Sequence, residues 1–279
     1  MTEEGKSRGS SLQRIGTGIA LASVVLLGVL SNAFVFLSLI WLVIFVSAFE
    51  WTSFIGLRDF WSKLIYSTLV LGLCVLCFYF AKSPELLTIF IFIGVIFWFF
   101  AMIFIYRAAE EPGSSRTVGG WFFASAGVVI LSCTCASLIY LYEQSSALLI
   151  VLLSTVCSVD TLAYFGGKSK GRRKFVPSIS PRKTWEGVWF GVAGGSLVSL
   201  ISGYFFLSFE VPILLCLTFA TVLFAVVGDL FESLLKRTAN LKDSGNLLPG
   251  HGGVLDRVDS LLAGAPVFAG ITILAGVYE

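Results

Sequence analysis

Long apolar runs follow one another along almost the whole chain, and they limit its possible folds more than any other feature. A helix that crosses a bilayer needs about 20 mainly apolar residues, because lipid offers no partners for backbone N–H and C=O groups. The chain is 57% hydrophobic and only 13% charged, whereas soluble domains carry about 25% charged residues. The sequence therefore predicts an all-α polytopic membrane protein with about nine transmembrane helices, at 15–30, 33–49, 63–80, 86–105, 119–140, 146–166, 187–207, 211–230 and 260–277.

These spans divide into two parts with different chemistry. Residues 1–145 hold about five plain spans, and residues 146–279 hold the remaining spans and most of the polar motifs. Only Ser31 and Asn32 separate the first two spans, which predicts a tight hairpin.

The basic residues predict the orientation of the chain. With nine spans and the N-terminus inside, all but one of the 19 Lys and Arg residues fall in inner segments, and Lys82 is the exception. Cytoplasmic loops carry such an excess of positive charge. We therefore expect an integral protein of a bacterial cytoplasmic (inner) membrane, with the N-terminus and the polar connections 167–186 and 231–259 facing the cytoplasm.

Acidic residues lie near the inner ends of the late spans. Asp160 lies inside the sixth span, and an intramembrane carboxylate usually marks a site or a pathway. Asp256 and Asp259, spaced i and i+3, stand where the ninth span begins. They would also suit an ordinary helix start, which favours acidic residues.

The end of the eighth span carries a second polar stripe. Asp229, Ser233 and Lys236 share one helix face, and Glu232 lies beside them. Glu232 and Lys236 are also spaced as a plain surface ion pair. Because three helix ends deliver carboxylates to one membrane face, the pattern favours a site for a hard cation and phosphate.

The connection after the sixth span is strongly basic. We interpret Ser180 and Pro181 as the N-cap and first helical position of the seventh span. This would place the free N–H groups of that helix beside Arg182, Lys183 and Thr184, as an anion site. The same charge would also suit contact with anionic lipid headgroups.

The connection before the ninth span contains the only histidine, His251, between glycines. The run from Pro249 to Gly253 predicts irregular backbone that can approach a ligand closely. The sequence assigns no role to His251.

Three stretches together resemble the phosphatidate cytidylyltransferases (CDP-diacylglycerol synthases). Residues 233–259 read SLLKRTANLKDSGNLLPGHGGVLDRVD and match every fixed position of that family's signature. DTLAYFGG, from Asp160, and SPRKTWEG, from Ser180, are similar to two further stretches of the family. The first 145 residues match only as generic spans.

The resemblance implies synthesis of CDP-diacylglycerol and pyrophosphate from CTP and phosphatidic acid, in phospholipid biosynthesis. It implies Mg²⁺ as cofactor, with a monovalent cation such as K⁺, membrane lipids as surroundings, a homodimer, and no nucleic acid as partner. Carried over by position, Asp229 and Asp256 would hold the metal, supported by Asp259 and Asp160. Ser233 and Lys236 would act in catalysis, and the substrate-binding residues would be Ser180, Lys183, Thr184, Arg237, Lys242, His251 and Arg257.

Two other functions stay open at this point. A CTP-dependent polyprenol kinase would phosphorylate an alcohol and release CDP instead of pyrophosphate. A cation transporter would use Asp160 and Asp229 as ion ligands, although transporters often show repeated halves that this sequence lacks.

Overall fold

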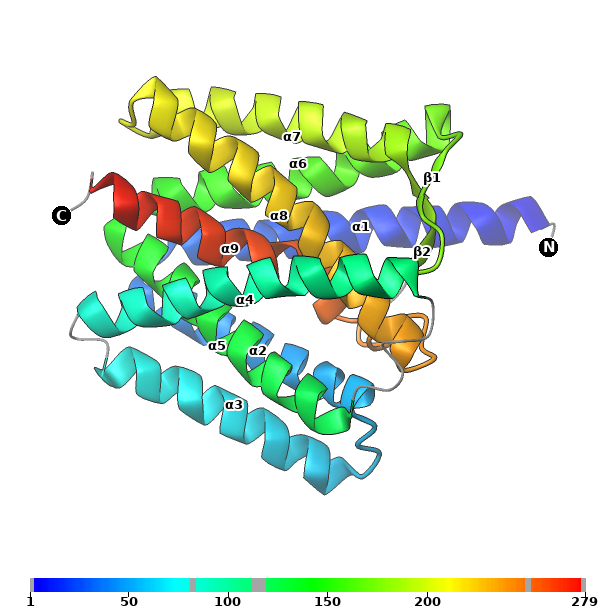
Figure 1. The fold of residues 1–279 in the computed structure, drawn as a ribbon, viewed down its shortest axis with the longest axis horizontal. Helices are drawn as coiled ribbons and strands as arrows, with labels where there is room; N and C mark the ends of the chain where they lie inside the picture. Colours follow the sequence, from blue (N-terminus) through cyan, green and yellow to red (C-terminus); the bar gives the residue numbers. More distant parts are fainter. Residues whose placement is uncertain (1–2, 81–83, 112–118, 249–251, 277–279) are drawn as a thin grey trace.

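The structure is a computed structural model that describes residues 3–80, 84–111, 119–248 and 252–276. These residues form a bundle of long helices with one small two-stranded sheet at its end (Figure 1). The helices match the nine predicted segments, so the predicted all-α membrane fold is confirmed. Their bounds are α1 (Glu3–Leu30), α2 (Ala33–Ile55), α3 (Phe60–Phe80), α4 (Pro84–Glu110), α5 (Gly120–Gln144), α6 (Ser146–Lys170), α7 (Trp185–Phe206), α8 (Val211–Thr238) and α9 (Leu255–Ala275).

Seven of these helices are long and apolar enough to cross a membrane, judged over the residues described. In α1 and α3 the apolar stretches are shorter, at Gly16–Leu30 and Phe60–Leu76. The predicted hairpin is present: only Ser31 and Asn32 separate α1 from α2, and the two helices are in contact. Asn32 also caps α2 by accepting a hydrogen bond from Val35 N at 3.1 Å. Several helices continue beyond the predicted spans, and α8 extends to Thr238.

Small residues bring α6 and α7 close together. A Cβ atom added to Gly187 would lie 2.8 Å from the carbonyl oxygen of Ala163, and one on Gly191 would lie 2.8 Å from that of Val159. Such close approach is typical of membrane helices, where packing replaces the hydrophobic drive for association. Asp160 follows Val159 in the part of α6 that makes this contact.

Helix α9 lies among α4, α5 and α8, and most of it is buried. Pro266 has no N–H, so the carbonyl oxygen of Leu262 loses its usual partner within the helix. Trp98 Nε1 of α4 donates to this oxygen at 3.0 Å, and Thr134 Oγ1 of α5 donates at 3.1 Å. Two neighbouring helices therefore satisfy a backbone group that lipid could not satisfy.

The predicted start of the seventh span is wrong. Ser180 and Pro181 belong to strand β2 (Ser180–Thr184), which pairs antiparallel with β1 (Lys174–Val176). Thr184 is the N-cap of α7 instead, and its Oγ1 accepts a hydrogen bond from Gly187 N at 3.2 Å. Proline is compatible with this position because a two-stranded ribbon consists of edge strands only.

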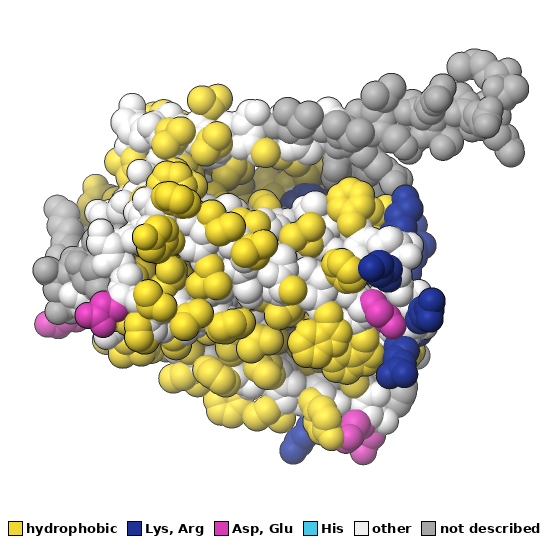
Figure 2. Space-filling view, turned by 90° about the horizontal axis from the view of Figure 1, so that it is seen from above, with side chains coloured by type: hydrophobic (Ala, Val, Ile, Leu, Met, Phe, Trp, Pro, Cys, Tyr) yellow, Lys and Arg dark blue, Asp and Glu magenta, His cyan; other side chains and the backbone are white. Residues whose placement is uncertain are grey.

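Positive charge gathers toward one end of the molecule. In Figure 2 the Lys and Arg side chains cluster at one end of the view, while hydrophobic side chains cover the body of the bundle. The strands β1 and β2 lie at this same end in Figure 1. The predicted separation of basic connections from the apolar body is present in the fold.

Candidate active site

Carboxylates from three helices meet near the polar end of the bundle. Asp160 comes from α6, Asp229 from α8 and Asp259 from the first turns of α9. They lie close enough to interact electrostatically with one another. Ser260 Oγ donates a hydrogen bond to Asp160 Oδ1 at 2.9 Å, which joins α9 to α6. The predicted convergence of these three helix ends is present in the structure.

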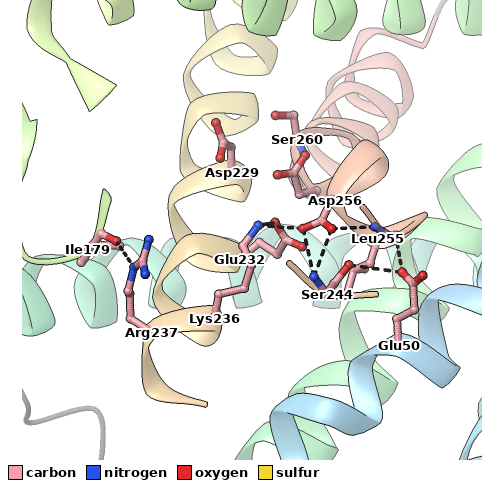
Figure 3. Close-up of polar contacts among 12 residues, drawn as sticks. Glu50, Ile179, Asp229, Glu232, Lys236, Arg237, Ser244, Leu255, Asp256 and Ser260 are labelled. Carbon is pink, nitrogen blue, oxygen red and sulfur yellow. Dashed lines mark hydrogen bonds and ion pairs between the residues drawn. The ribbon is translucent and has the colours of Figure 1, made fainter. Parts of the chain in front are cut away.

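Two lysines neutralise part of this charge. Lys183 of β2 forms an ion pair with Asp229, although its Nζ has no hydrogen-bond partner among the residues described. Lys236 of α8 is shared between Glu232, on its own helix, and Asp256 of α9, at 2.8 Å (Figure 3). Lys236 therefore links α8 to the start of α9, which a plain surface pair would not do.

Asp256 is held by the described part of the connection between α8 and α9, residues 239–248 and 252–254, here called the α8–α9 loop. Its Oδ2 accepts hydrogen bonds from Ser244 N at 3.0 Å and from Gly253 N at 2.8 Å. Gly252 has φ +83°, and a Cβ atom there would lie 2.7 Å from Asp256 Oδ2. Glycine is required at this position both for its backbone angle and for the space it leaves.

The site contains more acidic than basic side chains. Burial of unpaired carboxylates is costly unless a cation or proton joins them. Glu232 is 2% exposed, and its Oε1 has no hydrogen-bond partner among the residues described. Two lysines, Lys183 and Lys236, face five carboxyl groups, which belong to Asp160, Asp229, Glu232, Asp256 and Asp259.

This donor set fits a hard cation, with one restriction. Within the described part of the chain, no three His, Cys, Asp or Glu side chains converge as a complete ligand group. Mg²⁺ commonly takes one or two carboxylates and completes its shell with water and substrate phosphates. The surplus negative charge therefore fits Mg²⁺ if the substrate provides the remaining oxygens.

The other predicted residues described by the structure lie on β2, α8, the α8–α9 loop and α9. Thr184 caps α7, and Arg237 Nε donates to the carbonyl oxygen of Ile179 at 3.2 Å, joining α8 to the loop before β2. Ser180 and Ser233 are half-buried, whereas Lys242 and Arg257 are exposed near the α8–α9 loop. His251 lies outside the described residues.

Two further acidic residues, Glu50 and Glu232, lie at the site although the sequence pattern did not predict them there. Glu232 was not among the predicted site residues, because its spacing from Lys236 also suits a surface pair, but it is buried inside the cluster. Glu50 of α2 is 7% exposed and contacts the α8–α9 loop through Ser244 and Val254. The signal was present in the sequence, since Glu50 is an acidic residue at the end of an apolar run, as Asp160 is.

Comparison with known proteins gives a consistent result. A model of the cytidylyltransferase family matches residues 12–274. The chain is 36% identical to a phosphatidate cytidylyltransferase of Pseudomonas aeruginosa over 270 residues, which cover 95% of this chain and 97% of that protein. It is 36% identical to one of Rickettsia typhi over 66% of this chain and 86% of that protein. It is 43% identical to one of Haemophilus influenzae over 44% of each chain.

Proposed function

This chain belongs to the cytidylyltransferase family, and we propose that it transfers the cytidylyl group of CTP to phosphatidic acid. The products are CDP-diacylglycerol and pyrophosphate, and the reaction belongs to phospholipid biosynthesis. One observation supports this function most strongly: carboxylates and lysines from β2, α6, α8 and α9 meet at the basic end of a membrane bundle. A lipid phosphate and a soluble nucleotide can both reach such a place.

The reaction needs positioning more than proton transfer. An oxygen of the phosphatidate phosphate attacks the α-phosphorus of CTP, and the bond from that phosphorus to the bridging oxygen breaks. The attacking oxygen is already an anion, so a general base has little to contribute. The main obstacle is repulsion between two polyanions, which fixed cations and orientation overcome.

The two site lysines supply fixed positive charge. Lys183 is ion-paired with Asp229, so its ammonium group lies beside that carboxylate as fixed positive charge for a phosphate. Lys236 is held by Glu232 and Asp256, which fix it beside the cluster. Lys242, Arg237 and Arg257 are exposed in or beside the α8–α9 loop, and their positive charge would attract the triphosphate.

Mg²⁺ would neutralise phosphate charge in this site. Asp229 and Asp256 are the proposed ligands, with Asp259 and Asp160 as supporting acids. Asp256 already accepts bonds from Lys236 and two backbone N–H groups, so it would offer only a remaining lone pair. A monovalent cation such as K⁺ and a homodimer remain predictions from the resemblance.

The basic end is proposed to face the cytoplasm of a bacterial inner membrane. This orientation gives CTP access from the cytoplasm, and the lipid substrate arrives laterally. The charge distribution in Figure 2 supports it, because cytoplasmic segments carry the excess of Lys and Arg.

The test is a reaction of the purified protein with phosphatidate, Mg²⁺ and CTP labelled at the α-phosphate. We expect a labelled lipid and one pyrophosphate per lipid formed, and no product after chelation of Mg²⁺. A polyprenol kinase would instead transfer the γ-phosphate to an added polyprenol and release CDP. Ion flux in proteoliposomes without CTP, and no labelled lipid, would indicate a transporter.

A further inference from the structure

Glu50 is a buried acidic residue without a basic partner among the residues described. It lies on α2, far in sequence from the motifs of the active site, and is 7% exposed. None of the ion pairs in the described part of the chain includes it. Its charge must therefore be stabilised by hydrogen bonds, since a buried carboxylate without partners is unstable.

Those hydrogen bonds come from the start of α9 and the loop before it. Leu255 N donates to Glu50 Oε2 at 2.8 Å (Figure 3). Val254 N donates to Glu50 Oε1 at 3.1 Å. Ser244 Oγ donates to Oε2 at 3.2 Å. Helix α9 has no capping side chain of its own, because Val254 occupies the N-cap position. Glu50 therefore caps α9 from another helix and satisfies N–H groups that the helix leaves free.

The loop is shaped to admit this side chain. A Cβ atom on Gly245 would lie 2.3 Å from Glu50 Oε1, and one on Gly253 would lie 2.4 Å from Oε2. Any larger residue at either position would displace the carboxylate. Two glycines of the α8–α9 loop thus leave the space that Glu50 occupies.

The same loop segment contacts Glu50 on one side and Asp256 on the other. Ser244 donates through Oγ to Glu50 and through N to Asp256. Gly253 N donates to Asp256, and the next two N–H groups donate to Glu50. Asp256 in turn contacts Lys236. An unbroken series of contacts therefore runs from α2 through the loop to the lysine of the active site.

We propose that Glu50 is a positioning residue for the transfer reaction: it fixes the α8–α9 loop and the start of α9 so that Asp256 and Asp259 face Lys236 and Asp229. This inference rests on the proposed function. Glu50 does not touch the reacting atoms, and it acts by holding the residues that do. The first part of the chain thereby contributes to a site whose motifs all lie in the second part.

The first experiment separates kcat from KM in Glu50→Gln. The amide keeps the size of the side chain, but its NH₂ group cannot accept a hydrogen bond, so at least one donor loses its partner. We expect kcat to fall roughly tenfold to a hundredfold, because small displacements of catalytic groups have effects of this order. The KM for CTP should change less than about threefold, since the exposed basic residues remain. The matched control is Glu143→Gln, at an exposed carboxylate on α5, and we expect its kcat to be unchanged.

A double-mutant cycle with Ser244→Ala tests the contact itself. Ser244→Ala removes one hydrogen bond to Glu50 and keeps the hydrogen bond from its backbone N–H to Asp256. We therefore expect a smaller fall in kcat than in Glu50→Gln. In the Glu50→Gln background, Ser244→Ala should change kcat little further, because the effects of mutations at residues in direct contact are not additive. Strictly additive effects would overturn the proposal.

Hydrogen exchange tests the positioning without relying on activity. In Glu50→Gln we expect faster exchange in the peptide that covers residues 241–256, and unchanged exchange in α5 and α7. Faster exchange throughout the protein would show that Glu50 has a general structural role. Unchanged exchange in this peptide would show that Glu50 does not hold the loop. Either result overturns the proposal. If wild-type protein makes no CDP-diacylglycerol, the proposed function fails, while this measurement still reports on Glu50.

Discussion

At the scale of single residues, Lys236 has the most demanding position. Its ammonium group is shared by Glu232 and Asp256, and its side chain is 15% exposed. Removal of one charge from a buried group of paired charges leaves its partners uncompensated. This lowers the stability more than removal of the whole group would.

We therefore predict that Lys236→Met is both inactive and unstable. The unfolding free energy should fall by about 3–5 kcal/mol, the usual effect of breaking a buried pair. The measurement is the thermal midpoint in detergent together with labelled-lipid formation. Lys174→Met, at an exposed lysine of β1, serves as control, and equal behaviour of the two variants would contradict a central role for Lys236.

Asp256 gives a second prediction at this scale. Asp256→Asn keeps the shape but loses the negative charge that holds Lys236 and two backbone N–H groups. We expect CTP-dependent lipid turnover to fall by about 100-fold or more, in line with the loss of a preorganised electrostatic group. Turnover near the wild-type value in purified protein would refute the assignment of Asp256 to the site.

At the scale of elements, the α6–α7 contact predicts a packing defect with a functional effect. Gly191→Leu would force a side chain against the backbone of Val159, and overpacking of this kind costs about 1–3 kcal/mol. Because α6 carries Asp160, we expect lower activity as well as a lower thermal midpoint. Gly72→Leu is the matched control, since nothing lies within 4 Å of a Cβ atom at Gly72, and there both quantities should stay near wild type.

The interruption in α9 gives a prediction with a built-in rescue. Trp98→Phe combined with Thr134→Val removes both donors to the carbonyl oxygen of Leu262. An unsatisfied buried acceptor costs about 1–3 kcal/mol, so the thermal midpoint should fall. Adding Pro266→Ala restores an N–H at the normal position in the helix and should recover part of the loss. No recovery would show that the destabilisation comes from lost packing alone.

At the scale of the whole molecule, the distribution of charge predicts sidedness. A cysteine introduced as Arg172→Cys, after α6, should be protected from a membrane-impermeant thiol reagent added to intact cells. Glu210→Cys, between α7 and α8 at the other end of the helices, should react. Labelling is compared with the parent protein, whose native cysteines set the background, and the reverse pattern would contradict the proposed orientation.

The one-dimensional pattern was enough to predict the membrane class, the helix segments and the delivery of carboxylates by three helix ends to one end of the bundle. Apolar length and charge position are local properties, and lipid requires each span to satisfy its own backbone. The predicted start of α7 was wrong because both Ser180–Pro181 and Thr184 are acceptable local signals for the beginning of a helix. Pairing of β1 with β2 decided between them.

Tertiary structure alone decided which partner each charge would take. The sequence spacing of Glu232 and Lys236 suits a surface pair, and only the approach of α9 converts it into a buried bridge to Asp256. Glu50 and Leu255 are more than 200 residues apart, so no local pattern could have paired them. The sequence by itself determined which segments enter the membrane and which end carries the charge, because burial in lipid depends on composition along the chain. Contacts between distant helices determined the site, because these depend on how the whole bundle packs.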